Sequence, residues 1–430
     1  MSDLLRVLLG VVTSAASGWL VDRALIRLEP SGARWPLRIL LSVVAVSTAL
    51  AQPILAALAL VVAVAVRLRE LRTQPAEDPA VTLVLPARVV AIVVVLMTLV
   101  VASRPPAAMY WDELVWLAKA RLAAPDPRRL VDEALRAGTN VVPFAYPLLH
   151  PIAVALLGGL STAPRAAVLG SEALAVVVGS LFVLLALESA TTTRLRRAFC
   201  LATLVAAAPL VLVHLRSAYV DLETGMLAAS LALALERKHG RAALVLAVTL
   251  VALKDEGIAH VLAVTAAFVL SDWHHDRPKA RGALVALGAG AASFVAWRVR
   301  VVASHAGVGD HTIGLPRLAR VGLVLTLLLR QATDLVSWGP LWVVTGGLTL
   351  AVAARCVRLD LAARRRFASL ALQALFLFGA IVTGSDRVAA FAESGTLVPR
   401  LLVQLAPMAL LLLAGALALP PRRRARLITG

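Results

Sequence analysis

The feature that most constrains this chain is the recurrence of long apolar stretches from one end to the other. A helix needs about 20 mostly apolar residues to cross the roughly 30 Å hydrocarbon core of a bilayer. Helix-length apolar runs therefore predict an all-α, polytopic integral membrane protein. We expect about 12 transmembrane helices, near residues 4–21, 39–66, 89–103, 166–187, 198–214, 221–236, 242–254, 257–270, 283–303, 338–354, 367–383 and 401–419.

Composition supports membrane insertion and argues against a soluble protein. Of 430 residues, 60% are hydrophobic and only 16% are charged, too few to cover a soluble surface. The net charge of +18 comes largely from short basic clusters between the apolar runs, which is typical of cytoplasmic loops. These clusters are Arg194–Arg197, Arg237–Arg241, Arg277–Arg281, Arg355–Arg366 and Arg422–Arg426. None has the interleaved aromatic residues of a nucleic-acid surface, so we expect the lipid bilayer and no nucleic acid as a partner.

The basic clusters also predict an orientation. We place the tail at 422–426 in the cytoplasm and treat two stretches, 148–160 and 316–335, as surface helices that do not span. All five clusters then lie inside, and three segments lie outside: 104–165, 215–220 and 384–400. We expect residues 1–88 to form N-terminal membrane helices of unclear role, 89–419 the transmembrane core and 420–430 a cytoplasmic tail.

The first two helices fit this topology poorly. Arg23–Arg38 falls outside, against the positive-inside rule. The run 39–66 is interrupted by Gln52-Pro53, which is compatible with a kinked helix or a tight hairpin. We prefer the kinked helix.

Two acidic motifs begin helices on the predicted outer face. They are Tyr110-Trp111-Asp112-Glu113 and Tyr219-Val220-Asp221-Leu222-Glu223. Paired carboxylates at a membrane surface suit a general base or a divalent cation. The structural alternatives are a helix start that favours acidic residues and, for Asp221, a helix N-cap.

A third charged motif, Leu253-Lys254-Asp255-Glu256-Gly257, interrupts an apolar run. Such charges are costly in a membrane unless they are paired or face a wet cavity. We expect the apex of an outward-pointing hairpin, where an ammonium would suit a phosphate group. A self-neutralised structural turn is the alternative. Because all three motifs lie on one predicted face, the sequence indicates a single outward-facing active site.

These motifs, in this order, resemble the GT-C superfamily of membrane glycosyltransferases, which includes protein O-mannosyltransferases and bacterial aminoarabinose transferases. The resemblance covers roughly residues 89–419. Asp112 is at the position of the essential carboxylate of the first external loop. Tyr146–Pro151 resembles the "YPPLLP" start of a juxtamembrane helix, with Leu148 replacing the second proline. Ser217–Leu222 resembles the second acidic motif, "YADLP", with Glu223 replacing its proline.

Two further motifs of the superfamily resemble the C-terminal half. Leu253–Gly257 is similar to the "LKNEG" turn near the carrier phosphate, with Asp255 for the common Asn. Ser394–Leu402, with Gln404 and Pro407, resembles the "R-LL-Q-x-x-P" element. Arg400 is therefore a second phosphate-facing candidate. Residues 1–88 have no clear counterpart.

The resemblance implies short juxtamembrane helices in the first external loop and an inverting transfer from a polyprenyl-phosphate sugar to an extracytoplasmic glycan, lipid or protein hydroxyl. The implied location is the plasma membrane. The implied catalytic residues are Asp112, as general base, with Glu113 and Asp221. The residues implied to bind the sugar donor and its phosphate are Lys254, Glu256, Arg400, Tyr146 and Tyr219. Asp112 and Asp221 are the metal candidates if Mg²⁺ or Mn²⁺ is used, and no other cofactor is expected.

Three other functions compete with this interpretation. A transporter or lipid flippase also uses intramembrane charges, although no internal repeat is visible and the charges gather toward one face. A surface-polysaccharide polymerase or ligase would take a diphosphate-linked donor and rely more on external arginines and histidines. A structural scaffold is the third alternative.

Overall fold

The computed structural model describes residues 3–29, 32–73, 111–136, 147–190, 192–215, 217–305, 317, 319–354 and 359–418, and each element among them is helical. This confirms the all-α prediction for the described part of the chain. Six described helices are long and apolar enough to cross a membrane. They are α1 with the π-helical turn η1 that continues it (Asp3–Ile26), α2 (Arg34–Ala51), α8 (Pro164–Ser189), α14 (Arg277–Ala303), α18 (Leu361–Thr383) and α20 (Leu397–Leu417).

The other expected spans are shorter or broken. The run 198–214 is divided into α9 (Thr193–Ala206) and α10 (Pro209–Leu215), and the two helices meet at an angle of 93°. The break comes just before Pro209, because a proline disfavours helical backbone angles at the residue that precedes it. Helices α12 (Gly240–Leu253), α13 (Gly257–Asp272) and α17 (Leu341–Ala353) have 13 to 16 residues. At 1.5 Å per residue they extend only about 20–24 Å. Twelve spans therefore stay a prediction, and the expected span at 89–103 lies outside the described residues.

The predicted surface helices are short. The segment predicted to be the first external loop contains α5 (Trp111–Ala123), α6 (Pro127–Ala134) and α7 (Leu149–Leu157). The stretch 316–335 contains α15 (Ala319–Ala332), followed by α16 (Leu335–Trp338); α19 (Asp386–Glu393) lies against α15. Neither α7 nor α15 is long enough to be a candidate span, as expected.

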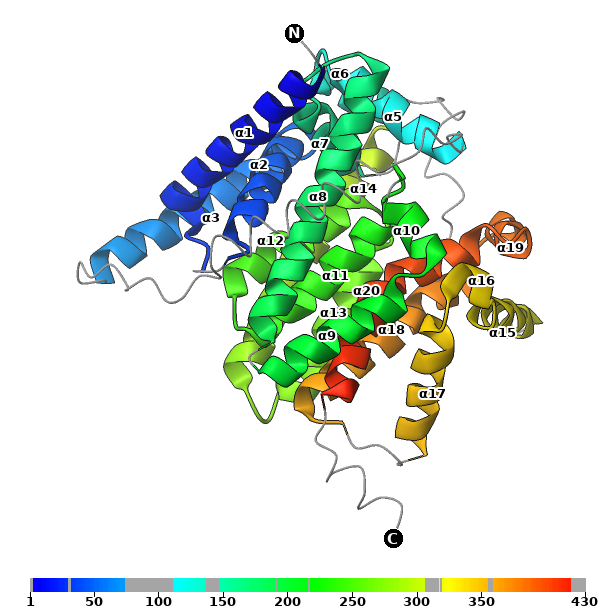
Figure 1. Cartoon of the computed structure of the whole chain (residues 1–430). Helices are drawn as coiled ribbons and strands as arrows, with labels where there is room; N and C mark the ends of the chain where they lie inside the picture. The colour runs from blue at the N-terminus through cyan, green and yellow to red at the C-terminus, as the bar shows by residue number, and fades with distance from the viewer. Residues whose placement is uncertain are drawn as a thin grey trace.

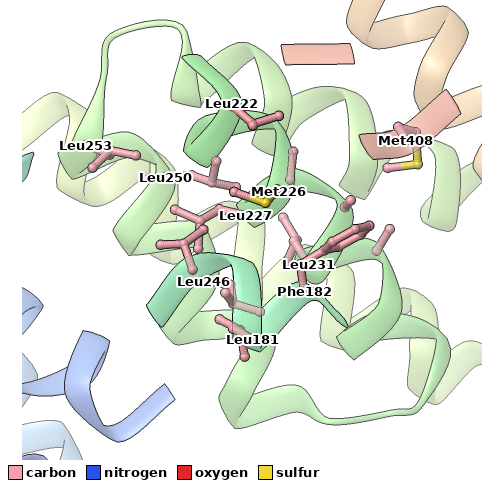
Figure 2. Close-up of a cluster of buried hydrophobic side chains, with 14 of the residues drawn as sticks. Leu181, Phe182, Leu222, Met226, Leu227, Leu231, Leu246, Leu250, Leu253 and Met408 are labelled. Carbon is pink, nitrogen blue, oxygen red and sulfur yellow. The ribbon is translucent and has the colours of Figure 1, made fainter. Parts of the chain in front are cut away.

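Helix α11 (Asp221–Glu236) lies at the centre of the body, against α8, α12, α13 and α20. Residues 221–235 are all buried, because the helix is apolar on every side and has neighbours on every side. Figure 2 shows part of this core, with Leu222, Met226, Leu227 and Leu231 of α11 beside Leu181 and Phe182 of α8, Leu246, Leu250 and Leu253 of α12, and Met408 of α20.

The body has two chemically different ends. The basic end includes residues 192–197, 236–241, 272–281 and 361–366. Arginine and lysine side chains there pair with carboxylates at the ends of neighbouring helices. Arg366 holds Glu236 by two hydrogen bonds of 2.7 and 2.8 Å, and Lys238 pairs with Asp276 at 3.0 Å. The motif end comprises residues 113–119, 217–223, 253–257 and 397–404. Helix α8 runs between the two, beginning near α5 and α7 and ending beside α9 (Figure 1). The predicted separation of basic clusters from acidic motifs is thus present in the described residues.

The first helices require a correction. Arg241 at the basic end contacts the carbonyl of Arg27, the carboxylate of Glu29 and that of Glu70 in α3 (Pro53–Thr73). Residues 27–29 precede α2, and Glu70 is near the end of α3, so α2 and α3 run in opposite directions. The preferred kinked helix was wrong, and the Gln52-Pro53 interruption is a hairpin.

This hairpin also removes the exception in the predicted topology. A single span at 39–66 would place all the residues before it on the opposite side of the membrane. With two passes there, Arg23–Arg38 joins the other basic segments, where Arg34 and Arg38 pair with the fully buried Asp22. The start of α1 lies toward the other end, where Arg6 donates to Ser161 at 2.7 Å.

Candidate functional site

The candidate site is built around Asp221, the first residue of α11, whose side chain is fully buried. Its Oδ1 accepts from Lys254 Nζ at 2.6 Å and from Gln404 Nε2 at 2.8 Å. Its Oδ2 accepts from Arg400 Nε at 2.8 Å. The N-cap is Val220 rather than Asp221, so the capping alternative was wrong. Asp221 instead joins α11, α20 and the α12–α13 turn.

A glycine fixes the distance between α11 and α20. A Cβ on Gly225, one turn after Asp221, would lie 2.2 Å from the backbone oxygen of Gln404. Only a residue without a side chain lets the two backbones approach this closely. The close approach brings Asp221 within reach of Arg400 and Gln404.

Lys254 is positioned by the turn that the sequence predicted between two apolar helices. It follows the last residue of α12 in extended conformation, and α13 begins three residues later at Gly257. Lys254 also pairs with Glu256 at 3.2 Å, and Asp255 pairs with Arg298 of α14 at 2.5 Å. The charges are thus paired mainly with other helices, and the turn does not simply neutralise itself.

Arg400 and Tyr219 form the more accessible side of the cluster. The Arg400 guanidinium lies 4.8 Å from the centre of the Tyr219 ring, and that ring lies 5.4 Å from the His214 ring. The side chains of Arg400 and Glu256 are each 26% exposed, whereas Asp221 and Lys254 are almost completely covered. Arg400 is therefore the cation of this cluster that is partly exposed.

The first acidic motif meets the second. Glu113, in the first turn of α5, is buried, and its Oε1 accepts from the backbone nitrogen of Ala218 at 2.8 Å. This contact ties the start of α5 to the loop that leads into Asp221. Asp112 belongs to α5, but its side chain lies outside the described residues, as does Tyr146. The predicted meeting of Asp221 and Lys254 is confirmed, and the position of the Asp112 carboxylate stays a prediction.

A buried lysine near this site was missed by sequence reasoning. Lys119 in α5 is buried, and its ammonium lies 4.8 Å from the centre of the Trp116 ring. That ring is nearly perpendicular to the His150 ring of α7, with the two centres 5.2 Å apart. Burial lowers the pKa of Lys119 to about 7, although the Asp255 carboxylate opposes the shift. Burial, reinforced by Lys119, lowers the pKa of His150 to about 3. The available signal was that Lys119 is one of only four lysines in the chain.

The tentative metal role of Asp221 does not fit its surroundings. Both carboxylate oxygens already accept hydrogen bonds, and two of the three donors are cations. A divalent cation there would have to displace Lys254 and Arg400 from the carboxylate. Across the described part of the chain, no group of three or more His, Cys, Asp or Glu side chains could hold a metal ion.

Together these features define an all-α membrane protein with a buried, highly charged cluster at one end of its helical body. Comparison with protein-family models, curated proteins and solved structures finds no match to this chain.

Proposed function

We propose that this chain is a membrane glycosyltransferase that transfers a sugar from a polyprenyl-phosphate donor to an acceptor outside the cytoplasm. The observation that carries the proposal is the convergence of Lys254 and Arg400 on Asp221, beside the start of α5. Three motifs distant in the sequence supply these groups, and the resemblance to the GT-C superfamily relates each of them to donor or acceptor chemistry.

In this proposal Asp112 takes the proton of the acceptor hydroxyl. The acceptor oxygen then forms a bond to the anomeric carbon of the sugar, and the bond from that carbon to the phosphate oxygen breaks with its electron pair on the phosphate. Attack from the opposite side inverts the anomeric configuration. A positioned carboxylate base contributes roughly 10²–10⁴-fold to the rate.

The cations stabilise the leaving phosphate. Asp221 holds Lys254 and Arg400 in place before the donor arrives, so little reorganisation is needed as charge develops. Asp221 and Glu113 are therefore positioning residues in this scheme, because both are buried and engaged with other protein groups. Tyr219 and Glu256 lie on the accessible side, toward the sugar and the carrier.

The test is retention of a lipid and transfer of its sugar by purified protein. We expect mass spectrometry to find a polyprenyl phosphate bound to the wild type, and proteoliposomes to transfer label from decaprenyl-phosphate mannose or undecaprenyl-phosphate aminoarabinose. Asp112→Asn should keep the lipid and lose transfer, and Arg400→Gln should lose both. Asp132→Asn, in α6, is the control expected to keep both.

Two results would contradict the proposal. Full transfer by Asp112→Asn would show that the base assignment is wrong. A wild-type protein that neither retains a polyprenyl phosphate nor transfers a sugar would exclude the glycosyltransferase.

The second candidate is a transporter or flippase, which one observation favours. Arg365, Ser369 and Gln373 follow one another at four-residue spacing on α18, all buried, and each has a polar atom without a hydrogen-bond partner among the described residues. Rows of buried polar side chains are typical of pathways through membranes. The test is thiol labelling of the Asp221→Cys and Lys254→Cys variants. Thiols that become accessible alternately from the two sides of the membrane would favour transport.

A further inference from the structure

A chain of buried polar side chains leads from Asp221 into the helical body. Gln404 Nε2 donates to Asp221, and Gln404 Oε1 lies 2.9 Å from His260 Nε2. On the other side of the ring, His260 Nδ1 lies 2.9 Å from the Gln373 amide oxygen. All four side chains have zero exposure, although they come from α11, α20, α13 and α18.

The chemistry of these groups fixes the direction of the first two hydrogen bonds. An ionised carboxylate only accepts, so Gln404 must present its NH₂ group to Asp221 and its oxygen to His260. His260 Nε2 must then carry a hydrogen and donate. The Asp221 carboxylate therefore determines, through Gln404, which nitrogen of His260 carries the hydrogen.

The other ring nitrogen decides whether His260 is charged. An imidazolium would place another positive charge in a fully buried position, which is expensive. A neutral ring accepts at Nδ1, from the NH₂ group of Gln373 once that amide is turned about its side-chain axis. Gln373 Nε2 has no hydrogen-bond partner within the described residues where it lies; after the turn it donates to His260 Nδ1, and the amide oxygen takes its former position. The neutral form with hydrogen on Nε2 follows.

Other buried polar side chains nearby show why this chain is not ordinary packing. Thr265 of α13, Thr249 of α12 and Ser230 of α11 donate to the carbonyl four residues earlier in their own helix. These hydrogen bonds stay within one helix and connect it to no other. Those of His260 cross to two other helices and end at the cluster that holds Lys254 and Arg400.

We propose that His260 is a positioning residue for this cluster, acting through Gln404. Without a donor at His260, the Gln404 oxygen would be buried and unsatisfied, and the amide could turn that oxygen toward the Asp221 carboxylate. Two acceptors facing each other repel, so the Asp221 carboxylate would shift and would no longer fix the positions of the Lys254 and Arg400 side chains. The inference rests on the proposed function where it concerns turnover.

The first test is a double-mutant cycle on sugar transfer. His260→Phe keeps a ring but removes both nitrogens, and we expect kcat to fall about tenfold or more because a buried acceptor is left unsatisfied. His260→Gln, which can place an amide N–H near the position of Nε2, should recover most of the loss. Thr265→Val, on the same helix, should leave kcat unchanged.

The cycle also tests the route through Gln404. If His260 acts through that residue, His260→Phe should have little further effect in a Gln404→Leu background. Equal losses in the two backgrounds, or no rescue by His260→Gln, would overturn the proposal.

A second measurement does not depend on transfer. In ¹⁵N-histidine-labelled wild type, the signal that disappears in His260→Gln should report hydrogen on Nε2 and none on Nδ1. An unprotonated Nε2 or a doubly protonated ring would overturn the inference, even if the protein transfers sugar. Conversely, the expected spectrum in a protein that neither binds a polyprenyl phosphate nor transfers sugar would exclude only the proposed function.

Discussion

Asp221 and Asp386 show how burial changes the meaning of similar contacts. Each carboxylate pairs with two cationic side chains, Asp221 with Lys254 and Arg400, and Asp386 with Arg317 and Arg320. The Asp221 side chain is fully covered, whereas that of Asp386 is 80% exposed, and Arg320, although itself buried, also donates to the backbone oxygens of Ile381 and Gly384. Exposed pairs are screened by water, but a buried cation that loses its partner keeps the whole cost of desolvation.

We therefore expect Asp221→Asn to destabilise the protein far more than Asp386→Asn. Breaking a buried pair costs about 3–5 kcal/mol, and an exposed pair contributes about 0–1 kcal/mol. Thermal unfolding of the two purified variants in the same detergent measures the difference. Equal melting temperatures would mean that the Asp221 cluster is not closed to water.

Lys119 gives a prediction in which pH is the variable. Helix α5 is not among the candidate spans, and burial lowers the pKa of Lys119 from 10.5 to about 7. Below pH 7 the folded and unfolded states both hold the proton, and the folded state bears the cost of the buried charge. Between about pH 7 and 10.5 only the unfolded state still holds it, so this group makes folding more favourable as pH rises.

The wild type should accordingly gain stability relative to Lys119→Met as the pH rises from 7 to 9. Methionine has a similar length and no proton to exchange, so the difference isolates this residue. Melting temperatures of both proteins across the pH range provide the measurement. Parallel curves for the two proteins would show that Lys119 titrates normally.

At the scale of helices, the contact of α11 with α20 is the one on which the site most depends. Gly225 lets their backbones touch, and the Asp221, Arg400 and Gln404 side chains follow from that approach. Gly346, in the middle of α17, is an equivalent helical glycine, but a Cβ there would meet no atom within 4 Å in the described structure.

Gly225→Ala should therefore separate α11 from α20, lower the melting temperature and abolish lipid-phosphate binding. An overpacked core site costs about 1–3 kcal/mol or more. Gly346→Ala should be neutral or slightly stabilising, since alanine favours helix by about 0.5–1 kcal/mol. The pair is compared by thermal unfolding and by mass spectrometry of bound lipid. A Gly225→Ala protein that behaves like Gly346→Ala would contradict the close approach.

On the scale of the whole molecule, charge is divided between the two ends of the helical body. The basic segments, now including Arg23–Arg38, gather at one end, and the acidic motifs and Lys254 at the other. The positive-inside rule predicts a cytoplasmic location for the basic end. The candidate site would then face outward, as the proposed function requires.

Cysteine labelling tests this arrangement. After removal of Cys200 and Cys356, an impermeant maleimide added to intact cells should label Ser394→Cys. Arg23→Cys and Arg237→Cys should react only after permeabilisation. Labelling of Arg23→Cys from outside, with Arg237→Cys protected, would contradict the hairpin between α2 and α3.

The sequence alone indicated a membrane protein made of helices, and it contained the motifs that form the candidate site. Those properties depend on apolar length and local charge, which add up along the chain without reference to distant contacts. Asp221 and Lys254 could be selected in this way because charge is conspicuous in apolar sequence.

Only the tertiary structure decided which groups meet. The reversal at Gln52-Pro53 is seen in the contacts of Arg241, about 190 residues away in the chain. The proposed role of His260 depends on glutamines from two other helices. A proline is compatible with a kink or a turn, and a lone histidine with many roles. The choice is made by long-range packing and by the need to satisfy every buried polar group, which no local pattern contains.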